Sequence, residues 1–374
     1  MRLQWGRGKS SVEGSGSCPE VLGKGACGVA RLNGRIRVWG WSRRVAAGGL
    51  IIGVGLLGGC QAGADYVNGA QALAALAAEP LDTTPWEFSH APGVLITTEH
   101  YKVYTTVRDP LYQRLLAKLL EATYRRAVAA QPAGHAIGPM ECYVFGDRAQ
   151  WELYTRLRAG SNAPVYLQIS AGGYCQEGVF AGYDIGREQT LSVIAHEAWH
   201  QYSWYTFKDR LPSWLEEGLA TQNEAIEWNG VSPEFRPELN YRRYSALKQA
   251  MREGRIRKIS ELTNTHAGRE IKGSERTVGG YYAQLWSLTM FLQHSKYRVG
   301  LQRMLDDAQS GKLSECLAGT GVSKAEIAGF TERWNVVAGP MYLKKYISAD
   351  PGFEGEYQAF LKDFTSTWPP KVGD

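Results

Sequence analysis

The sequence predicts an α+β fold in which a mixed, twisted β-sheet is followed by a mainly helical lobe. Up to about residue 224, segments with period-two alternation and many β-forming residues are interleaved with segments whose apolar residues recur at helical spacing. Beyond residue 224 the helical spacing prevails. A chain of 374 residues can bury a large core, so one elaborated domain and two lobes are both compatible with its length.

The first half begins with strands and a long helix. Alternation across residues 94–107 predicts strands, and Asp109-Pro110 then begins a helix that runs to about Ala130 with its leucines on one side. Further strands are predicted at 141–145, 164–170 and 178–183, with a Gly-rich turn at 171–173, and further helices at 148–158 and 188–205.

The second half is expected to form a helical lobe that closes a cleft. Amphipathic or apolar runs predict helices at 241–253, 280–294, 323–334 and 355–364. The expected organisation is a leader at 1–59, a tether at 60–92, a sheet-containing subdomain at 93–224 and a helical C-terminal lobe at 225–374.

The helix predicted at 188–205 carries the most informative pattern in the chain, His196-Glu197-Ala198-Trp199-His200. Residues four apart lie on one face of a helix, so both imidazoles can reach one ion. Glu197 lies beside them, where a water at an open coordination position needs a general base. The pattern predicts a zinc hydrolase site, and because it is short its context must support it.

The context is the downstream segment Trp214-Leu215-Glu216-Glu217-Gly218, which offers a third ligand. Two glutamates are adjacent, and one of them must face the metal. Ser213 and Glu216 have the spacing of a capping box at a helix start. That gives Glu216 a local role at the N-terminus of the helix and leaves Glu217 to face the metal.

The two segments together resemble the gluzincin metallopeptidases of the peptidase MA clan. The sequence A-H-E-A-W-H-Q-Y, followed by L-P-S-W-L-E-E-G-L-A-T-Q-N-E, is similar to a bacterial branch of that clan. The specific resemblance covers about residues 190–224, and a looser one about 97–295. It implies a zincin-like fold, in which the strand before the metal helix, expected at 178–183, edges a cleft to which an extended peptide can add.

The resemblance also implies roles for individual residues. His196, His200 and Glu217 would bind one Zn²⁺, and Glu197 would act as the base. Aminopeptidases of this group carry a G-x-M-E-N-type motif that binds the amino terminus of the substrate. This sequence has no such motif, so the resemblance does not extend to aminopeptidase activity.

Two further residues are candidates for the site. In gluzincin aminopeptidases a tyrosine that opens a later helix stabilises the oxyanion, and Tyr282, with Tyr281 as the fallback, fits that position. Glu224 lies two turns after Glu217 on the same helix face and could orient a ligand histidine. Core packing of the tyrosines and a solvated helix charge at Glu224 are the plain structural alternatives.

The N-terminal region has the features of an export signal. An apolar run at 45–59 follows four arginines and ends in Leu57-Gly58-Gly59-Cys60. It is fifteen residues long, which is short for a membrane span. A basic region, an apolar core and small residues before a cleavage site predict a secretory signal. The ending resembles the bacterial lipobox, which implies lipidation of Cys60 and a protein anchored to a membrane of the bacterial cell envelope.

The charge balance and the cysteines limit the partners. The chain has a formal charge of +5, but residues 1–59 contain nine Lys and Arg and two Asp and Glu. The remainder has 33 basic and 35 acidic side chains, which gives no support to nucleic-acid binding. Cys142, Cys175 and Cys316 have no C-x-x-C spacing. A Cys142–Cys175 disulfide and three buried free thiols are both compatible with the sequence.

The sequence therefore predicts a zinc-dependent metallopeptidase of the cell envelope that acts on peptide or protein substrates. Two alternatives remain. A zincin fold with little turnover could bind envelope polymers or proteins, and the same metal chemistry could hydrolyse an amide of cell-wall peptide.

Overall fold

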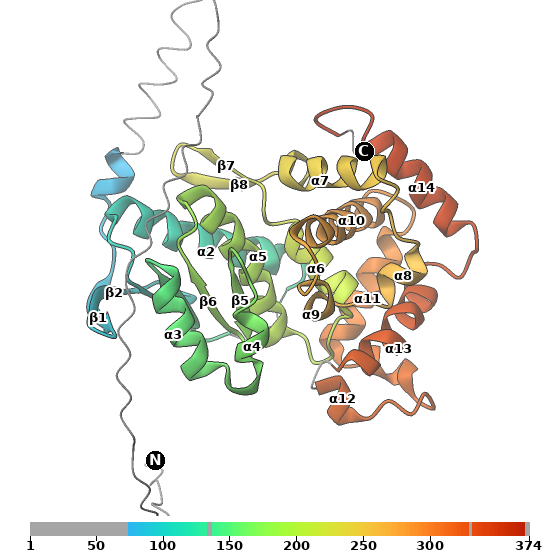
Figure 1. Ribbon diagram of the computed structural model, residues 1–374, viewed down its shortest axis with the longest axis horizontal. Helices are drawn as coiled ribbons and strands as arrows, with labels where there is room; N and C mark the ends of the chain where they lie inside the picture. Colours follow the sequence, from blue (N-terminus) through green and yellow to red (C-terminus); the bar gives the residue numbers. More distant parts are fainter. Residues whose placement is uncertain (1–73, 133–136, 329–330, 371–374) are drawn as a thin grey trace, which may run out of the picture. The chain divides into compact units, whose positions relative to one another are not determined.

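A six-stranded mixed sheet forms the first half of the protein (Figure 1). The structure is a computed structural model that describes residues 74–132, 137–328 and 331–370. The strands are β1 Thr83–Phe88, β2 Ala91–Thr97, β3 Tyr101–Thr105, β4 Met140–Phe145, β5 Gly173–Gln176 and β6 Val179–Tyr183. Their order is β1-β2-β3-β4-β6-β5, with β3, β4 and β6 parallel and the other neighbours antiparallel.

Helices cover both faces of this sheet. They are α2 Pro110–Ala130, α3 Arg148–Arg158 and α5 Arg187–Thr206. Helices α2 and α5 pack against each other on one face, and α3 packs on the other (Figure 1). Along β4, Val144 joins the large core shared with α2 and α5, whereas Phe145 joins a smaller cluster with Trp151 of α3. This division follows from strand geometry, which sends successive side chains to opposite faces.

Most elements of the first half are where the sequence predicts them. The helices expected at 109–130, 148–158 and 188–205 and the strand expected at 141–145 are confirmed to within one or two residues. Asp109 caps α2 by accepting hydrogen bonds from two backbone N–H groups of its first turn.

The strand predicted at 164–170 is wrong. The segment begins in a short helix, α4 (Ala163–Tyr166), because Pro164 fits the first turn of a helix. Tyr166 then stacks on Tyr174 of β5 with the ring centroids 4.0 Å apart. A short apolar run cannot be assigned to helix or strand by its periodicity alone. In the structure the segment forms a helix, and Tyr166 at its end contacts Tyr174 of β5.

The edge of the sheet is β5 and not the strand expected at 178–183. That strand, β6, lies between β4 and β5. The turn predicted at 171–173 is also misplaced, since β5 already begins at Gly173. The connection to β6 is a tight turn at Glu177-Gly178, where φ is 53° and 75°. Two residues with positive φ match the twist of an antiparallel hairpin.

The sheet also begins earlier than predicted. Residues 83–92 belong to β1, to its turn and to the start of β2, and not to a tether, because β1 pairs with β2 from Thr83 to Phe88. The predicted leader, Cys60 and the first part of the tether lie outside the described residues. Within the described part of the chain, no helix has the length and apolar character needed to cross a membrane.

The second half is mainly helical but opens with a two-stranded hairpin. Its elements are β7 Ile226–Asn229, β8 Ser232–Phe235, α7 Tyr241–Arg252, α8 Ile259–Thr263, α9 Ala267–Glu270, α10 Glu275–Gln293, α11 Arg298–Ser310, α12 Lys324–Ala328, α13 Glu332–Tyr342 and α14 Phe353–Phe364. The helices expected at 241–253 and 355–364 are confirmed. The helix expected at 280–294 starts earlier, and the run at 323–334 is divided between α12 and α13. A mixed sheet followed by helices agrees with the predicted α+β class.

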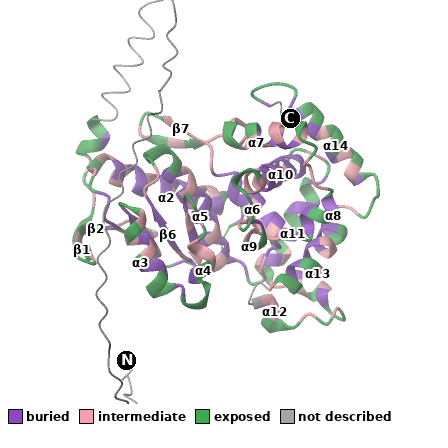
Figure 2. Ribbon diagram, viewed as in Figure 1, coloured by how far each residue is buried: buried purple, intermediate pink, exposed green. Residues whose placement is uncertain are grey.

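Helix α6 (Ser213–Thr221) lies between α5 and α10 and contacts both. Gly218 is its closest point of contact with α10. A Cβ at this position would lie 2.2 Å from the hydroxyl oxygen of Thr289 and 3.2 Å from the carbonyl oxygen of Leu285. Only glycine therefore permits this helix spacing. Figure 2 shows buried residues along both β6 and α10. The pair of helices α6 and α10 therefore continues the hydrophobic core of the sheet.

Candidate metal centre

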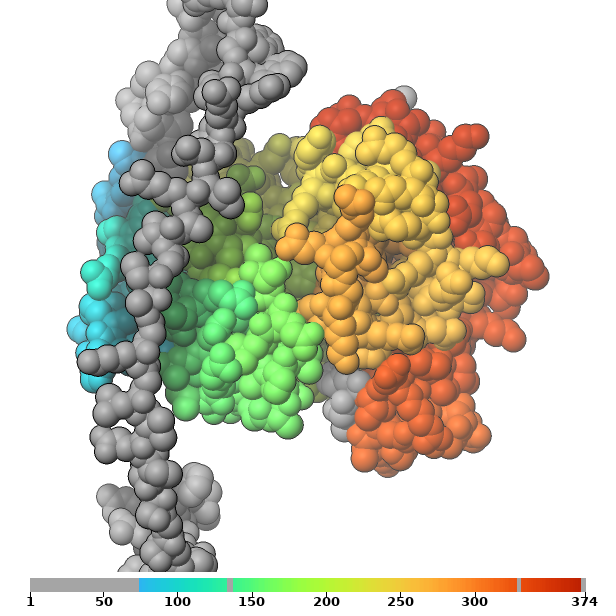
Figure 3. Space-filling view, viewed as in Figure 1, coloured from blue at the N-terminus to red at the C-terminus, as the bar shows by residue number. Residues whose placement is uncertain are grey.

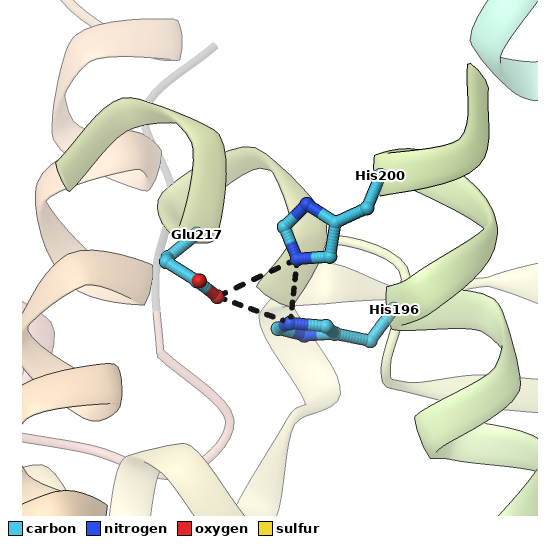
Figure 4. A group of neighbouring side chains, drawn as sticks. All are labelled: His196, His200 and Glu217. Carbon is cyan, nitrogen blue, oxygen red and sulfur yellow. Dashed lines mark hydrogen bonds and ion pairs between the residues drawn. The ribbon is translucent and has the colours of Figure 1, made fainter. Parts of the chain in front are cut away.

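Two imidazoles from α5 and one carboxylate from α6 point toward one another (Figure 4). The Nε2 atoms of His196 and His200 are 3.3 Å apart. Oε2 of Glu217 lies 3.2 Å from Nε2 of His196 and 3.6 Å from Nε2 of His200. The three side chains are 10–16% exposed, so the group is largely shielded from solvent.

The spacing of these donor atoms fits a tetrahedral metal ion. Donors at about 2.0–2.1 Å from a tetrahedral zinc ion are about 3.3–3.4 Å from one another. The observed separations of 3.2, 3.3 and 3.6 Å scatter around that value. Two imidazole nitrogens and one carboxylate are also the donor set of catalytic zinc sites that keep one position open. His196, His200 and Glu217 therefore form a group that could hold one metal ion, and these three side chains are called the metal group below.

A second set of neighbouring donors, Glu99, His100 and Glu121, has a different character. The carboxylate of Glu121 accepts hydrogen bonds from the Thr98 hydroxyl at 2.7 Å and from the backbone N–H of His100 at 2.9 Å. Its other oxygen lies 2.8 Å from Nδ1 of His100. These contacts already use the oxygens of Glu121 to fix the turn before β3, so we do not assign a metal to this set.

Each metal-facing histidine contacts a second carboxylate through its other ring nitrogen. Oε1 of Glu224 lies 2.9 Å from Nδ1 of His196, and Oε1 of Glu216 lies 2.9 Å from Nδ1 of His200. Donation from Nδ1–H to a carboxylate fixes the ring and leaves Nε2 available for a metal. The structure places Glu224 beside His196, as the sequence predicts, but not on the helix face of Glu217, because α6 ends at Thr221 and Glu224 lies beyond it. The contact of Glu216 with His200 is not predicted by the sequence.

The capping box expected at the start of α6 is not formed. Pro212 is the N-cap residue, and Ser213 is the first residue of the helix. The Ser213 hydroxyl instead accepts a hydrogen bond from the backbone N–H of Ala267 at 3.1 Å. Glu216 is turned toward α5 and not toward the helix start. The choice of Glu217 as the residue that faces the histidines agrees with the structure, but the capping argument for it is wrong.

Glu224 is surrounded by further donors. Its Oε2 accepts hydrogen bonds from Nδ2 of Asn240 at 2.9 Å and from Nε of Arg243 at 2.7 Å, and its Oε1 lies 2.5 Å from a second guanidinium nitrogen. Burial would raise the pKa of Glu224, but the charge of Arg243 and the hydrogen bond with His196 hold it well below its usual range. Asn240 also caps α7, so the start of that helix positions both donors. An N-cap with a basic residue three positions later is too common a pattern to predict this role.

The surrounding carboxylates favour positive charge on the two histidines. Burial lowers the pKa of His196, but hydrogen bonds with Glu217 and Glu224 outweigh it and raise the pKa to about 9. The pKa of His200 is also raised, because Glu217 and Glu216 outweigh burial. In return the histidines hold the pKa of Glu217 well below its usual range despite burial. The same field favours a metal cation, which takes the place of the protons.

Glu197 lies next to this group and is 9% exposed. Burial raises its pKa, while the charges of His200 and His196 and a hydrogen bond from the backbone N–H of Cys175 act in the opposite direction. The balance leaves the pKa raised. A raised pKa makes the carboxylate a stronger proton acceptor, which suits a general base. Because both histidines and the backbone N–H of Cys175 contribute to this pKa, Glu197 lies near strand β5 as well as near the two imidazoles.

Of the two candidate tyrosines on α10, Tyr282 faces the metal group. Its ring centroid is 6.1 Å from that of His196, and the Arg243 guanidinium lies 5.0 Å from the centroid of its ring. Tyr281 is 2% exposed, and its hydroxyl lies 3.4 Å from the hydroxyl of Ser213. Tyr281 therefore helps to pack α10 against α6. Both tyrosines lie inside α10 and not at its start, because the helix begins earlier than predicted.

The cysteines of the described residues are free thiols. Cys142 on β4 is buried and donates to Oε1 of Gln201 at 3.2 Å. Cys175 lies on β5, and Cys316 donates to the carbonyl oxygen of Leu313 in the second half. The structure therefore has free thiols and no Cys142–Cys175 disulfide, but of the three only Cys142 is buried, whereas the sequence-based alternative expected all three to be buried.

The metal group lies between two parts of the molecular surface. Figure 3 shows the surface hollowed between residues around 150–180, in green, and residues around 240–280, in yellow and orange, and Figure 1 places α5 and α6 between these parts. A separate cavity of about 590 Å³ lies at the carboxyl ends of β3, β4 and β6, and none of the metal-group residues lines it.

Most of the site residues expected from the sequence therefore meet in one place, whereas Cys60 lies outside the described residues. The residues brought together are His196, His200, Glu217, Glu197, Tyr282 and Glu224. Comparison with known proteins adds nothing to this geometry: no protein-family model, no curated protein and no solved structure matches the chain.

Proposed function

We propose that this protein is a zinc-dependent metallopeptidase of the gluzincin type with a zincin-like fold. The observation that carries the proposal is the spacing of the three donor atoms, which match the edges of a zinc tetrahedron. The immediate neighbourhood of Glu197 adds the base that peptide hydrolysis needs. The packing of α2 and α5 on one face of a mixed sheet, with the metal-facing histidines on α5, supports the zincin-like assignment.

The residues of the site have separate tasks in this proposal. A zinc ion held there would supply Lewis acidity toward a carbonyl oxygen and toward water. Glu197 takes a proton from the attacking water and passes it to the leaving amine. The Tyr282 hydroxyl donates a hydrogen bond to the oxyanion. The carboxylates on Nδ1 of His196 and His200 keep both Nε2 lone pairs directed at one point.

A peptide is the substrate class that fits the open edge of β5. In the register with β6, Gln176 pairs with Val179 across the tight turn. Hydrogen-bonded and non-hydrogen-bonded pairs alternate along an antiparallel ladder, so Gly173 and Cys175 direct their main-chain groups away from β6. An extended peptide can pair with such an edge. The backbone N–H of Cys175 contributes to the pKa of Glu197, so β5 lies near the base and a peptide paired with this edge would be close to it.

We further propose that the protein works in the bacterial cell envelope. The support is the sequence alone, namely the basic and apolar leader at 1–59 and its ending at Cys60. Export followed by lipidation of Cys60 would anchor the chain to a membrane and restrict its substrates to peptides and proteins of that compartment.

The substitution Glu197→Gln tests the function. Parent and variant are analysed for zinc content and then incubated with a broad peptide library, with and without a chelator. We expect the variant to keep its zinc and to lose turnover by a factor of about 10²–10⁴, because no other group takes the proton. Glu188→Gln removes an exposed carboxylate from the first turn of the same helix and should change neither property. Cleavage by Glu197→Gln at the parent rate would exclude Glu197 as the base.

The same experiment separates the alternatives when purified cell wall is digested in parallel. Chelator-sensitive release of cell-wall peptide without cleavage of the library would assign the amide bond of the wall as the substrate. Binding of library or wall without chelator-sensitive turnover of either would identify a scaffold and refute the proposed hydrolase.

A further inference from the structure

Gln201 follows His200 on α5, is fully buried and uses all its polar groups. Its Nε2 donates to the carbonyl oxygens of Glu141 at 2.8 Å and of Gly178 at 3.0 Å. Its Oε1 accepts from the thiol of Cys142 at 3.2 Å. Glu141 and Cys142 belong to β4, whereas Gly178 lies in the turn between β5 and β6. One side chain therefore ties the helix with the metal-facing histidines to two separate segments of the sheet.

The tip of the β5–β6 hairpin also packs directly against α5. Gly178 has a φ of 75°, and a Cβ on this residue would lie 2.7 Å from ring atoms of both Trp204 and Tyr205. The tip thus rests on the last turns of α5 and is hydrogen-bonded there by Gln201. This is a fixed point immediately C-terminal to the second metal-facing histidine.

The fixed point adds to the other contacts of β5, in which Tyr174 stacks on Tyr166 and packs against Trp151. The strand is four residues long and pairs with β6 on one side only. Within the described residues no strand pairs with its other side, and the backbone N–H of Cys175 is one of the groups that lower the pKa of Glu197, so β5 lies near that carboxylate. The distance between the open edge and Glu197 therefore depends on how the hairpin is held against α5, and the Gln201–Gly178 hydrogen bond is a direct link between these two elements.

We propose that Gln201 is a positioning residue that holds the edge strand β5 at its working distance from Glu197 and the metal group. An extended substrate paired with β5 is then presented to the base in register. The consequence for turnover rests on the proposed function, whereas the effect on the hairpin does not.

The free thiol of Cys175 reports directly on the position of β5. The full, zinc-loaded chain is treated with iodoacetamide, and the alkylation rates of Cys175 and Cys316 are compared by mass spectrometry. Gln201→Met keeps the side-chain volume and removes the hydrogen bonds. We expect it to raise the Cys175 rate relative to Cys316 about tenfold, the scale of a lost hydrogen bond. Gln284→Met is the matched control, because Gln284 is 1% exposed and bonds to backbone groups in the second half.

A second variant keeps the test decisive if Gln201→Met does not fold. Gly178→Ala leaves Gln201 intact but introduces a Cβ against Trp204 and Tyr205, so it should displace the tip and raise the same ratio. An unchanged ratio in both variants would overturn the proposal. An equal rise in Gln284→Met would also overturn it, because that result indicates general loosening of the fold.

Kinetics on peptides of increasing length test the consequence for turnover. Gln201→Met is expected to keep its zinc and to raise KM for extended peptides about tenfold, with a smaller change in kcat. An equal loss of kcat for all lengths at constant KM would contradict a positioning role. If the parent protein shows no chelator-sensitive turnover, the proposed function fails, while the alkylation ratios still decide whether Gln201 holds β5.

Discussion

Replacing Glu224 with glutamine tests whether a buried carboxylate controls the orientation of His196. The substitution keeps the size of the side chain but turns one acceptor oxygen into an NH₂ donor. In the structure, Oε1 of Glu224 faces His196 and Arg243, and Oε2 faces Asn240 and Arg243. Both oxygens are therefore opposed by donors, and either orientation of the amide places its NH₂ group against at least one of them.

The magnitude follows from these contacts. Removing a group that orients a metal-binding histidine weakens metal affinity about 10–100-fold, which corresponds to about 1.4–2.7 kcal/mol. The fold is weakened as well, because Arg243 loses its counter-charge while its side chain is only 12% exposed. Breaking a buried ion pair by removing one partner costs about 3–5 kcal/mol. We expect the lower end of that range, because the remaining carbonyl oxygen of the amide can still accept a hydrogen bond.

Competition with a chromophoric chelator near neutral pH measures the zinc affinity, and thermal unfolding of the zinc-free proteins measures the stability of the fold. Glu234→Gln removes the same charge from an exposed side chain of β8 and should alter neither quantity. A Glu224→Gln protein that binds zinc within about twofold of the parent would refute the orienting role. Weakening by Glu234→Gln to the same extent would instead attribute the effect to long-range charge.

Three other outcomes are expected at the same centre. Glu217→Ala should remove zinc from the purified protein because a donor is lost, whereas Glu216→Ala should weaken zinc binding about tenfold through the histidine that it contacts. Metal analysis and chelator competition measure both effects. They would show the reverse order if the two roles were exchanged. Tyr282→Phe should keep zinc and lower kcat about 10²-fold, with Tyr281→Phe as the control. Equal kcat values for the Tyr282 variant and the parent in steady-state kinetics would argue against Tyr282 as an oxyanion donor. Zinc added to metal-free protein near neutral pH should release protons, because the pKa of His196 is raised to about 9 and zinc displaces its proton. The release, followed with a pH indicator, should decline as the pH rises through about 9. A release independent of pH would contradict the assignment of His196 as a ligand.

The parts of this protein that its sequence predicts are those with local signals. The cap at Asp109 and the proline after it define the start of α2 within the chain itself. The positions of His196 and His200 on one helix face follow from the geometry of any helix. Glu217 could be chosen because a glutamate pair follows at a suitable distance, although the capping argument that favoured it is wrong.

The remaining features depend on how distant elements meet. The contact of Glu216 with His200 requires the crossing of α5 and α6, and the contact of Arg243 with Glu224 requires the hairpin β7–β8 to return the chain to the site. Neither relation leaves a repeating pattern in the sequence. The strand β5 is four residues long and contains a glycine, so its own alternation is too short to identify it.

The close contact at Gly218 has a mechanical consequence. It holds α6 close to α10, so Glu217 and Tyr282 come from one closely packed helix pair, while His196 and His200 come from α5, which packs on the sheet. A zinc ion bound by residues of α5 and α6 would act as a cross-link between these two helices. Removing it should therefore increase local opening between α5 and α6, with faster amide exchange in these two helices than in α2 or α10.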